Sequence, residues 1–595
     1  MAPIVYRLEM RSLLVACLVA CNVPPARPAG PAASAEPIAA RIDRITHHLL
    51  PAARVKGMDW HRNLEDRMRE LPVHGLSIAV FEHHHLAWAK GFGLEDVETR
   101  RPVTETTLFQ AGSISKAVNA LAALAAVEQG KLALDTPIND SLRSWKLGDN
   151  DFTRQRAVTL RQLLSHTAAT NVHGFLGYRA GAPVPTLVQI LDGAPPANTE
   201  KIVVDGTPGR EFRYSGGGTS IAQLALVDQI GLPYPALMTA SVLGPLGMTH
   251  STYEQPLPAA RVPEAAAGYH ADGSEVPGKR IVYPEMAAAG LWTTPSDLAA
   301  FLIELQLARE GKSSKISKQI AMEMTTPVAH VEGDDWIALG LYLMNRDGAK
   351  LFGHDGWDEG FQAEALASLD GGHGVVIMAN SDNGGEIFFD LERAVFAEYG
   401  WPMAPELERV AVEPAALAGF VGTYGTPGDP VVVTFASGAL FAHHPFDAPV
   451  ELVPVGSEKF VAMGGDSTFT LDHKLATTAP LVALEAGHPD AALAAWRADP
   501  EALPERAAIG VGRHLLQRRQ PRLAIGVFQL VAGVFPDSMN AHESLAESYE
   551  AAGDKPHAIA SYEAALAASA RDKVTRPAVK DKVRATCASA LARLN

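Results

Sequence analysis

The sequence predicts a multidomain chain, in which an α+β domain is followed by a small all-β domain and an all-α tail. Strand-like segments at 75–91 and 362–379 enclose a long stretch of helix and loop. From about Pro414 the chain consists of short apolar strands with turns, such as 431–435. From about Pro504 it is helical and repeats itself after 34 residues.

Length and composition agree with several soluble domains. A chain of 595 residues is too long for one hydrophobic core, and two to four domains are expected. The formal net charge of −16 argues against a nucleic-acid binder or a binder of anionic membranes, because such partners need clustered lysine and arginine. The predicted domains span residues 58–400, 412–485 and 504–595.

The N-terminus has the pattern of an export signal. Arg11 precedes a short apolar run, 12–21, which is too short to span a membrane as a helix. The run ends in Leu18-Val19-Ala20-Cys21, which resembles a bacterial lipoprotein box and makes Cys21 the expected lipidation site. An ordinary cleaved signal with incidental cysteines is the alternative, and Met10 is an alternative start. Residues 22–57 are expected to form a flexible tether.

No metal or cofactor is expected. Of the three cysteines, two lie in the signal and only Cys587 remains, so the sequence offers no disulfide framework or cysteine zinc site. Residues 82–85, Glu-His-His-His, are expected to form a polar hairpin turn rather than a metal site, since no second ligand cluster lies at a suitable spacing.

A serine and a lysine share one turn of a predicted helix. Ser113 stands at the helix start, and Lys116 follows on the same face. The free N–H groups and the positive dipole end of the helix favour an alkoxide and an oxyanion near the serine. Ser-x-x-Lys alone is common, however, and would also fit a capping serine beside a solvated lysine.

Two further stretches carry chemistry. Residues 209–218 place Tyr214 at the edge of a glycine-rich turn, and residues 351–357 form a strand end whose glycine allows another backbone to come close. In this order and spacing, the three stretches resemble the motif set of serine β-lactamases and penicillin-binding proteins. The similar branch is the class C β-lactamase-related one, with D-alanyl-D-alanine carboxypeptidases and esterases.

The resemblance covers residues 58–400 and implies both fold and site position. It implies a β-lactamase-like antiparallel sheet packed with helices and formed by the two ends of the domain. A helical lobe would be inserted between these ends, and the active site would lie between sheet and lobe. Other segments agree with it, namely 163–167, 245–249 and 289–298.

The resemblance also assigns roles to residues. Ser113 would be the nucleophile, and either Lys116 or Tyr214 would be the main base. The backbone N–H groups of Ser113 and Trp357 would form the oxyanion hole, beside Gly356.

Two positions depart from the family pattern. Gly216 stands where the second motif usually has asparagine, and His354 stands where the third usually has lysine. Histidine there would be cationic only in part near neutral pH. The smaller wall at Gly216 is expected to leave room for esters or unusual amides, so an esterase or peptidase is favoured over an efficient β-lactamase.

The C-terminal regions resemble known modules. The 412–485 region is similar to the small barrel-like domain that often follows such hydrolases. In the tail, pairs of similar residues lie 34 apart: Leu515 and Tyr549, Ala524 and Ala558, Phe528 and Tyr562. This period resembles two tetratricopeptide repeats, which implies a protein partner.

The leading hypothesis is therefore an exported, periplasmic serine hydrolase. It would act on a small-molecule or peptide acyl substrate, with the membrane reached only through a lipid anchor. A second hypothesis is a catalytically inactive scaffold protein that binds partners through its repeats. A Ser-His-Asp hydrolase is disfavoured, because no Gly-x-Ser-x-Gly elbow surrounds Ser113.

Overall fold

The computed structural model describes residues 37–595 except for positions 60–61, 347, 427–428, 464–467, 473, 476–478, 501–502, 574, 576 and 595. The predicted export signal, Cys21 and the first part of the predicted tether lie outside the described residues. Within these described ranges, no helix is both long and apolar enough to cross a bilayer.

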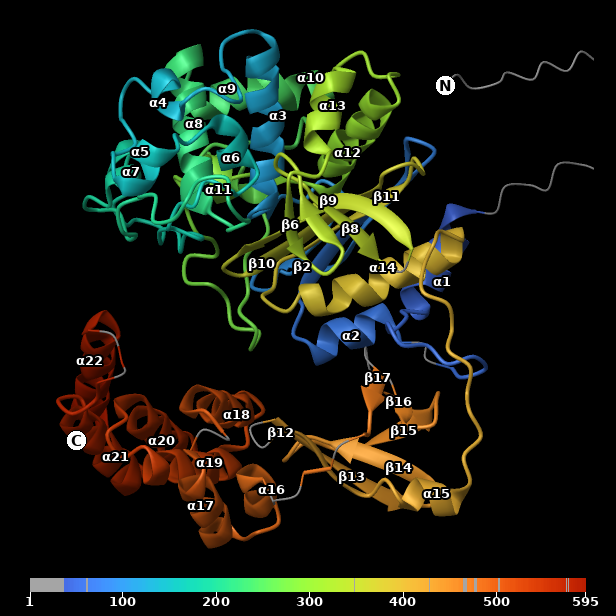
Figure 1. Ribbon diagram of the computed structural model, residues 1–595, viewed down its shortest axis with the longest axis vertical. Helices are drawn as coiled ribbons and strands as arrows, with labels where there is room; N and C mark the ends of the chain where they lie inside the picture. The colour runs from blue at the N-terminus through green and yellow to red at the C-terminus, as the bar shows by residue number, and fades with distance from the viewer. Residues whose placement is uncertain are drawn as a thin grey trace, which may run out of the picture.

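A nine-stranded antiparallel sheet forms the centre of the first domain (Figure 1), in the order β3-β2-β1-β11-β10-β9-β8-β7-β6. The central pair joins the two ends of the domain, since Leu76 of β1 pairs with Ala379 of β11. The prediction that both ends of the domain build the sheet is confirmed. The strands are β1 (Gly75–Glu82), β2 (His85–Asp96), β3 (Arg101–Pro102), β6 (Ala329–Glu332), β7 (Asp335–Ile337), β8 (Tyr342–Arg346), β9 (Ala349–Asp358), β10 (Phe361–Ser368) and β11 (Gly374–Ala379).

Helices cover both faces of this sheet, which explains why β1 is an almost unbroken apolar run. Ile78 and Val80 point to one face, where Leu391 packs on them. Ala79 and Phe81 belong to the core on the other face. The first face carries α1 (Ile38–His47), α2 (Leu64–Glu70) and α14 (Gly385–Tyr399), and the second carries α3 (Ile114–Glu128), α12 (Pro295–Arg309) and α13 (Lys318–Met324).

The chain between α3 and α12 forms most of the helical lobe at the upper left of Figure 1. Two short strands, β4 (Phe109–Gln110) and β5 (Trp292–Thr293), pair at its base. The lobe thereby holds α3 against the sheet. Its helices are α4 (Ile138–Ser141), α5 (Asp151–Gln155), α6 (Leu160–Leu164), α7 (Leu187–Asp192), α8 (Gly216–Ile230), α9 (Tyr234–Met238), α10 (Gly244–Leu246) and α11 (Met286–Ala289), with a π-helical turn at Thr239–Leu243 and a 3₁₀ turn at Val262–Glu264.

The predicted flexible tether, 22–57, is wrong from Ile38 onward. Helix α1 packs on α14, and Ile45 is buried between them. Arg44 forms a two-pronged salt bridge with Glu398, at 3.0 and 2.6 Å. The hydrolase-like domain therefore begins before residue 58.

A second sheet follows, with α15 (Pro414–Ala418) beside it. Its order, β12-β13-β14-β15-β16-β17, is a meander with β12 and β17 at its edges. In the described part of this region β12 and β17 are not paired with each other, and the predicted barrel-like character stays a prediction. Its core contains Tyr424, Val433, Leu440 and Phe460. The strands are β12 (Gly422–Thr426), β13 (Asp429–Ala436), β14 (Ala439–His443), β15 (Val450–Pro454), β16 (Lys459–Ala462) and β17 (Thr468–Thr470).

The helical tail begins earlier than predicted, at Pro480 instead of 504, because Leu481 and Trp496 belong to its core. The 34-residue period is visible as helix pairs: α20 and α21 each begin 34 residues after α18 and α19. The equivalent residues Phe528 and Tyr562 are both buried. The tail consists of α16 (Pro480–Glu485), α17 (Pro489–Ala498), α18 (Glu505–Gln517), α19 (Pro521–Val534), α20 (Met539–Ala551), α21 (Lys555–Ala568) and α22 (Pro577–Leu594).

The burial of α1 makes a testable prediction. Replacing Ile45 by alanine leaves a cavity between α1 and α14, and it is expected to lower the free energy of unfolding by about 2–4 kcal/mol. Ile38, on the same helix, is 43% exposed, and Ile38→Ala is the matched control with little effect. Urea unfolding followed by tryptophan fluorescence measures both. Equal effects of the two substitutions would show that α1 is not part of the folded domain.

Candidate active site

Ser113 stands at the N-cap of α3 and faces a cavity of about 620 Å³. The turn before the helix is held by backbone bonds, from Ser115 N to Gly112 O and from Ala111 N to Leu291 O. Ser113, Phe175, Leu176 and Trp357 are among the residues that line the cavity. The cavity lies between the sheet and the helical lobe, which is the position that the family resemblance implied for the active site.

Lys116 is buried beside the serine. Its Nζ atom lies 2.8 Å from Oγ of Ser113 and donates to the carbonyl oxygen of Ala288 at 2.7 Å. Burial lowers the pKa of Lys116 to about 7, although the nearby carboxyl groups of Asp358 and Asp355 act in the opposite direction. A large share of the amine is therefore neutral at physiological pH, and its lone pair is available to the serine.

Tyr214 is the third predicted catalytic residue beside Ser113 and Lys116, and it lies one residue before the N-cap of α8. Lys116 Nζ lies 5.0 Å from the centre of its ring. Burial raises the pKa of Tyr214 well above 10, although the nearby Ser113 side chain acts the other way. The phenol consequently stays protonated near pH 7, which distinguishes it from Lys116 as a base.

Two histidines, which were not among the predicted site residues, hold the Tyr214 ring. The rings of His166 and His173 lie 4.4 and 4.9 Å from it. Nδ1 of His166 accepts the N–H of Ser215 at 3.1 Å, and its carbonyl oxygen accepts the N–H of Arg213 at 2.7 Å. His166 lies in the 163–167 segment, whose resemblance to the family was the signal that could have indicated it.

Strand β9 passes close to the turn that carries the serine. A side chain at Gly356 would collide with the carbonyl oxygen of Ala111, at 2.0 Å, and would reach the N atom of Ser113 at 3.1 Å. A side chain at Gly112 would meet the N atom of Trp357 at 2.6 Å. Only glycine allows this approach, and it brings the backbone N atoms of Ser113 and Trp357 to the same side of the cavity.

His354, on strand β9, is not among the residues that line the cavity at Ser113. It is 3% exposed, and the rings of Tyr342 and Tyr214 lie 5.1 and 6.2 Å from it. Its Nδ1 atom is 2.5 Å from the carbonyl oxygen of Asp355. Burial lowers the pKa of His354, so the imidazole is neutral near pH 7. Burial thus favours the neutral form of His354 over the partial cation predicted for this position.

The position of Gly216 is filled by its neighbours. A Cβ atom there would lie 3.0 Å from the Phe175 ring and 3.1 Å from the carbonyl oxygen of His173. The prediction that glycine leaves room at this wall is wrong, because Phe175 occupies the space. The segment that carries Phe175 had no pattern in the sequence that indicated this.

Two buried carboxyl groups were also missed. Asp358, at the end of β9, is 2% exposed, and burial raises the pKa of its carboxyl group well above the usual value, although the Lys116 amine acts in the opposite direction. Glu285, before α11, is fully buried, and burial raises its pKa to about 8. Its oxygens accept no hydrogen bond from the described residues.

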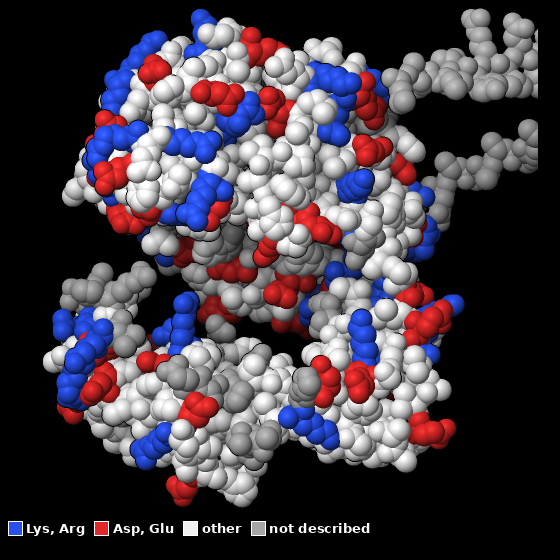
Figure 2. Space-filling view, in the orientation of Figure 1, with Lys and Arg blue, Asp and Glu red and all other residues white. Residues whose placement is uncertain are grey.

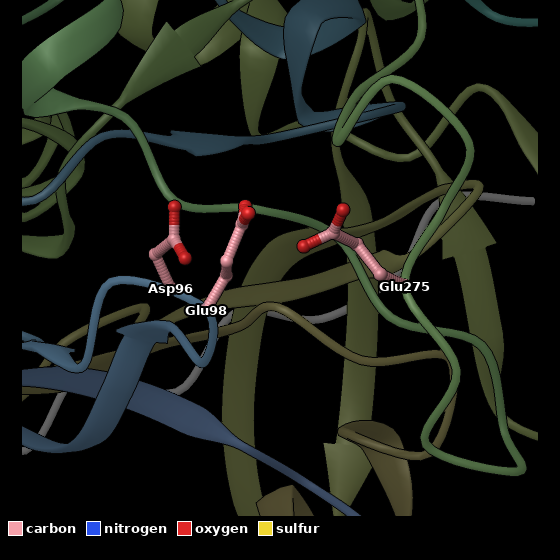
Figure 3. A group of neighbouring side chains, drawn as sticks. All are labelled: Asp96, Glu98 and Glu275. Carbon is pink, nitrogen blue, oxygen red and sulfur yellow. The ribbon is translucent and has the colours of Figure 1, made fainter.

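One group of carboxylates elsewhere has the spacing of a metal site. Figure 3 shows Asp96 and Glu98 on one segment and Glu275 facing them from a separate loop. Lys279 Nζ contacts all three, at 2.9, 2.6 and 3.8 Å respectively. The lysine ammonium supplies the positive charge that this cluster needs, so the cluster is an ion-pair network.

A serine and a buried lysine at a helix start, facing a cavity, form the arrangement that a nucleophilic serine requires. The comparison with protein families agrees. The model of the family described as Beta-lactamase matches residues 60–400, more than half of the chain, and the chain belongs to this family.

Individual relatives are distant. The chain is 25% identical over 334 residues to Protein flp of Staphylococcus aureus (strain NCTC 8325 / PS 47); the match covers 53% of this chain and 61% of that protein. It is 28% identical over 285 residues to Esterase EstB of Burkholderia gladioli, with 44% and 66% covered. The chain thus spans less than two thirds of these relatives.

A solved structure shares the fold. The octameric penicillin-binding protein homologue from Pyrococcus abyssi has a TM-score of 0.51 and 24% identity to this chain. The similarity covers 67% of this chain and 91% of that one.

The packing at Gly216 can be tested. Gly216→Asn must displace the Phe175 ring, and it is expected to lower the free energy of unfolding by about 1–3 kcal/mol. The loss should be smaller when Phe175→Ala is also present, because the ring is then absent. Gly148→Asn, at a position with nothing within 4 Å of a built Cβ, is the control. Thermal unfolding of Gly216→Asn, Phe175→Ala, the double variant and Gly148→Asn measures these losses. If Gly216→Asn is equally destabilising with and without Phe175, the packing of the ring on Gly216 is contradicted.

Proposed function

We propose that this chain is an exported serine hydrolase that forms an acyl-enzyme on Ser113 and cleaves an ester, an amide or a D-amino-acid peptide bond. The observation that carries the proposal is the 2.8 Å contact between Lys116 Nζ and Ser113 Oγ, made by a buried amine with a pKa of about 7. Membership of the Beta-lactamase family supports it.

In the proposed first step, neutral Lys116 takes the proton from Ser113 as Oγ bonds to the acyl carbon. The bond from the acyl carbon to the leaving oxygen or nitrogen breaks, and the leaving group receives the proton. Tyr214 is the proposed route for that transfer, because it lines the same cavity as Ser113 and its phenol stays protonated. A water molecule then attacks the acyl carbon, and Ser113 is released together with an acid.

The tetrahedral intermediate would be stabilised by the backbone N–H groups of Ser113 and Trp357. The observation that supports this assignment is the close approach of strand β9 to the serine turn at Gly356 and Gly112. In this proposal His354 does not touch the substrate, and its contacts are with the rings of Tyr342 and Tyr214.

The lining of the cavity supports an apolar acyl group. Phe175, Leu176 and Trp357 stand at the cavity, and Leu176 and Trp357 are 72% and 57% exposed. Phe175 fills the space where the family usually has an asparagine amide. An amide donor and acceptor is thereby replaced by a ring, which favours esters and simple peptides over β-lactams.

The remaining parts of the proposal concern location and partners. The lipoprotein-like Cys21 would anchor the protein at the periplasmic side of a membrane. The helix pairs α18–α19 and α20–α21 have the 34-residue period of tetratricopeptide repeats, and they would bind a protein partner.

The substitution at Gly216 is the observation that favours a second candidate, an inactive scaffold. Against it stands the intact buried contact of Lys116, since a lysine kept from water without a function costs stability.

The nucleophile can be tested by labelling. Wild-type protein should react with a fluorophosphonate probe, and Ser113→Ala should not, because Ser113 is the serine that contacts Lys116 Nζ among the residues that the structure describes. Hydrolysis of p-nitrophenyl acetate should fall by roughly 1,000-fold or more. Ser274→Ala, on an exposed loop, is the control and should behave as wild type. Equal labelling of wild type and Ser113→Ala would reject the proposal, and absence of both labelling and turnover in wild type would favour the scaffold.

The pKa of Lys116 predicts the pH dependence. Only the neutral amine accepts the proton, so the labelling rate should rise as pH passes through about 7 and level off above it. Between pH 6 and pH 8 the expected increase is about tenfold. Stopped-time labelling over this range measures it, with Lys116→Ala as the slow, flat reference. A rate that falls with pH would identify another group as the base.

A further inference from the structure

A second cavity, of about 780 Å³, lies on the helical lobe beside the active site. Figure 2 shows Lys and Arg side chains gathered on the part of the lobe that carries α5, α6 and α7. One wall of the cavity comes from the loops at 156–162 and 209–212, and the other from the β6–β7 hairpin. We refer to this cavity as the lobe groove.

The lobe groove contains arginines that differ in their partners. Arg161 is fully engaged, with both oxygens of Asp135 at 2.8 and 3.0 Å and with Glu323 at 2.7 Å. The guanidinium groups of Arg156 and Arg210 form no ion pair or hydrogen bond with any residue that the structure describes. Two cations thus remain available in a chain whose net charge is −16.

The position of Arg156 is set by Gly209. A Cβ atom at residue 209 would lie 2.9 Å from the guanidinium carbon of Arg156, so the guanidinium rests directly on the glycine. Arg210 is the next residue along the same loop. The acidic lining residues are Asp135, which Arg161 neutralises, and Glu211, which is exposed. The wall therefore carries an unpaired positive charge at Arg156 and at Arg210.

The groove adjoins the catalytic cavity. Phe212 lines both of them, and its ring lies 6.2 Å from Tyr342, which also borders the active site. Thr167 in the groove directly follows His166, whose ring packs on Tyr214. A substrate that passes Phe212 thus reaches from Ser113 into the groove.

The opposite wall presents an aromatic surface. Trp336 is 40% exposed, and the ring of His330 lies 5.4 Å from it. A chain lying on this surface would face the two arginines across the groove. Guanidinium groups bind carboxylates through paired N–H donors, which makes a carboxylate the fitting ligand.

We propose that the lobe groove is a subsite for a substrate segment bearing a free carboxylate, held by Arg156 and Arg210, while the scissile bond lies at Ser113. The inference rests on the proposed hydrolase function and narrows its substrate class to acyl compounds with an acidic end.

Binding tests the subsite without the chemistry. Monoethyl suberate, an ester with a terminal carboxylate, is titrated by calorimetry into full-length Ser113→Ala protein, and ethyl octanoate is its neutral counterpart. The acidic ligand should bind about fivefold to tenfold more tightly, and added salt should reduce the difference. The preference should disappear when Arg156→Ala and Arg210→Ala are added. Arg154→Ala is the control, because Arg154 is exposed, pairs with Asp151 and lies outside the groove lining.

Turnover provides the second readout. The measured quantity is the ratio of kcat/KM for mono-p-nitrophenyl suberate to that for p-nitrophenyl octanoate. This ratio should fall about fivefold or more in the double arginine variant and stay constant in Arg154→Ala. Equal affinity for both ligands, or a preference that survives loss of both arginines, overturns the subsite. Failure of the hydrolase function appears differently, as wild-type protein that cleaves neither ester and takes no fluorophosphonate label.

Discussion

The amine of Lys116 is held between Oγ of Ser113 and the carbonyl oxygen of Ala288, at 2.8 and 2.7 Å, with almost no access to water. This placement requires three separate segments: the start of α3, the α11 turn and strand β9. Burial makes the amine partly neutral, and the same burial keeps Tyr214 protonated. In the proposed mechanism, the division of roles between base and proton carrier follows from the form that burial favours in each group, which is the neutral amine and the protonated phenol.

Much of this site could be predicted from the sequence, because its chemistry is encoded in short local patterns. Ser113 and Lys116 lie one helical turn apart, so their contact depends only on the helix. The glycines at 112 and 356 allow a close backbone approach, which glycine in a strand end indicates. The two-ended sheet followed from the resemblance and is confirmed by the β1–β11 pair.

The remainder depends on contacts between distant segments, which no local pattern encodes. A glycine at position 216 led us to predict open space at this side of the site, but Phe175 comes from another loop and fills that space. His354 reads as a site residue, yet the rings of Tyr342 and Tyr214 separate it from the cavity. Helix α1 lies in a segment that we expected to be a flexible tether. A helix this short is stabilised by its packing on α14, and that contact cannot be inferred from the local sequence.

The pairing of β1 with β11 has a consequence for how the protein is made. Both strands are apolar along their length, and β1 leaves the ribosome long before its central partner is synthesised. The whole helical lobe must follow before the middle of the sheet can close. Such a non-local pairing makes folding slow, and it leaves an unpaired apolar strand exposed meanwhile. During synthesis, β1 therefore remains without its central partner until β11 has been made.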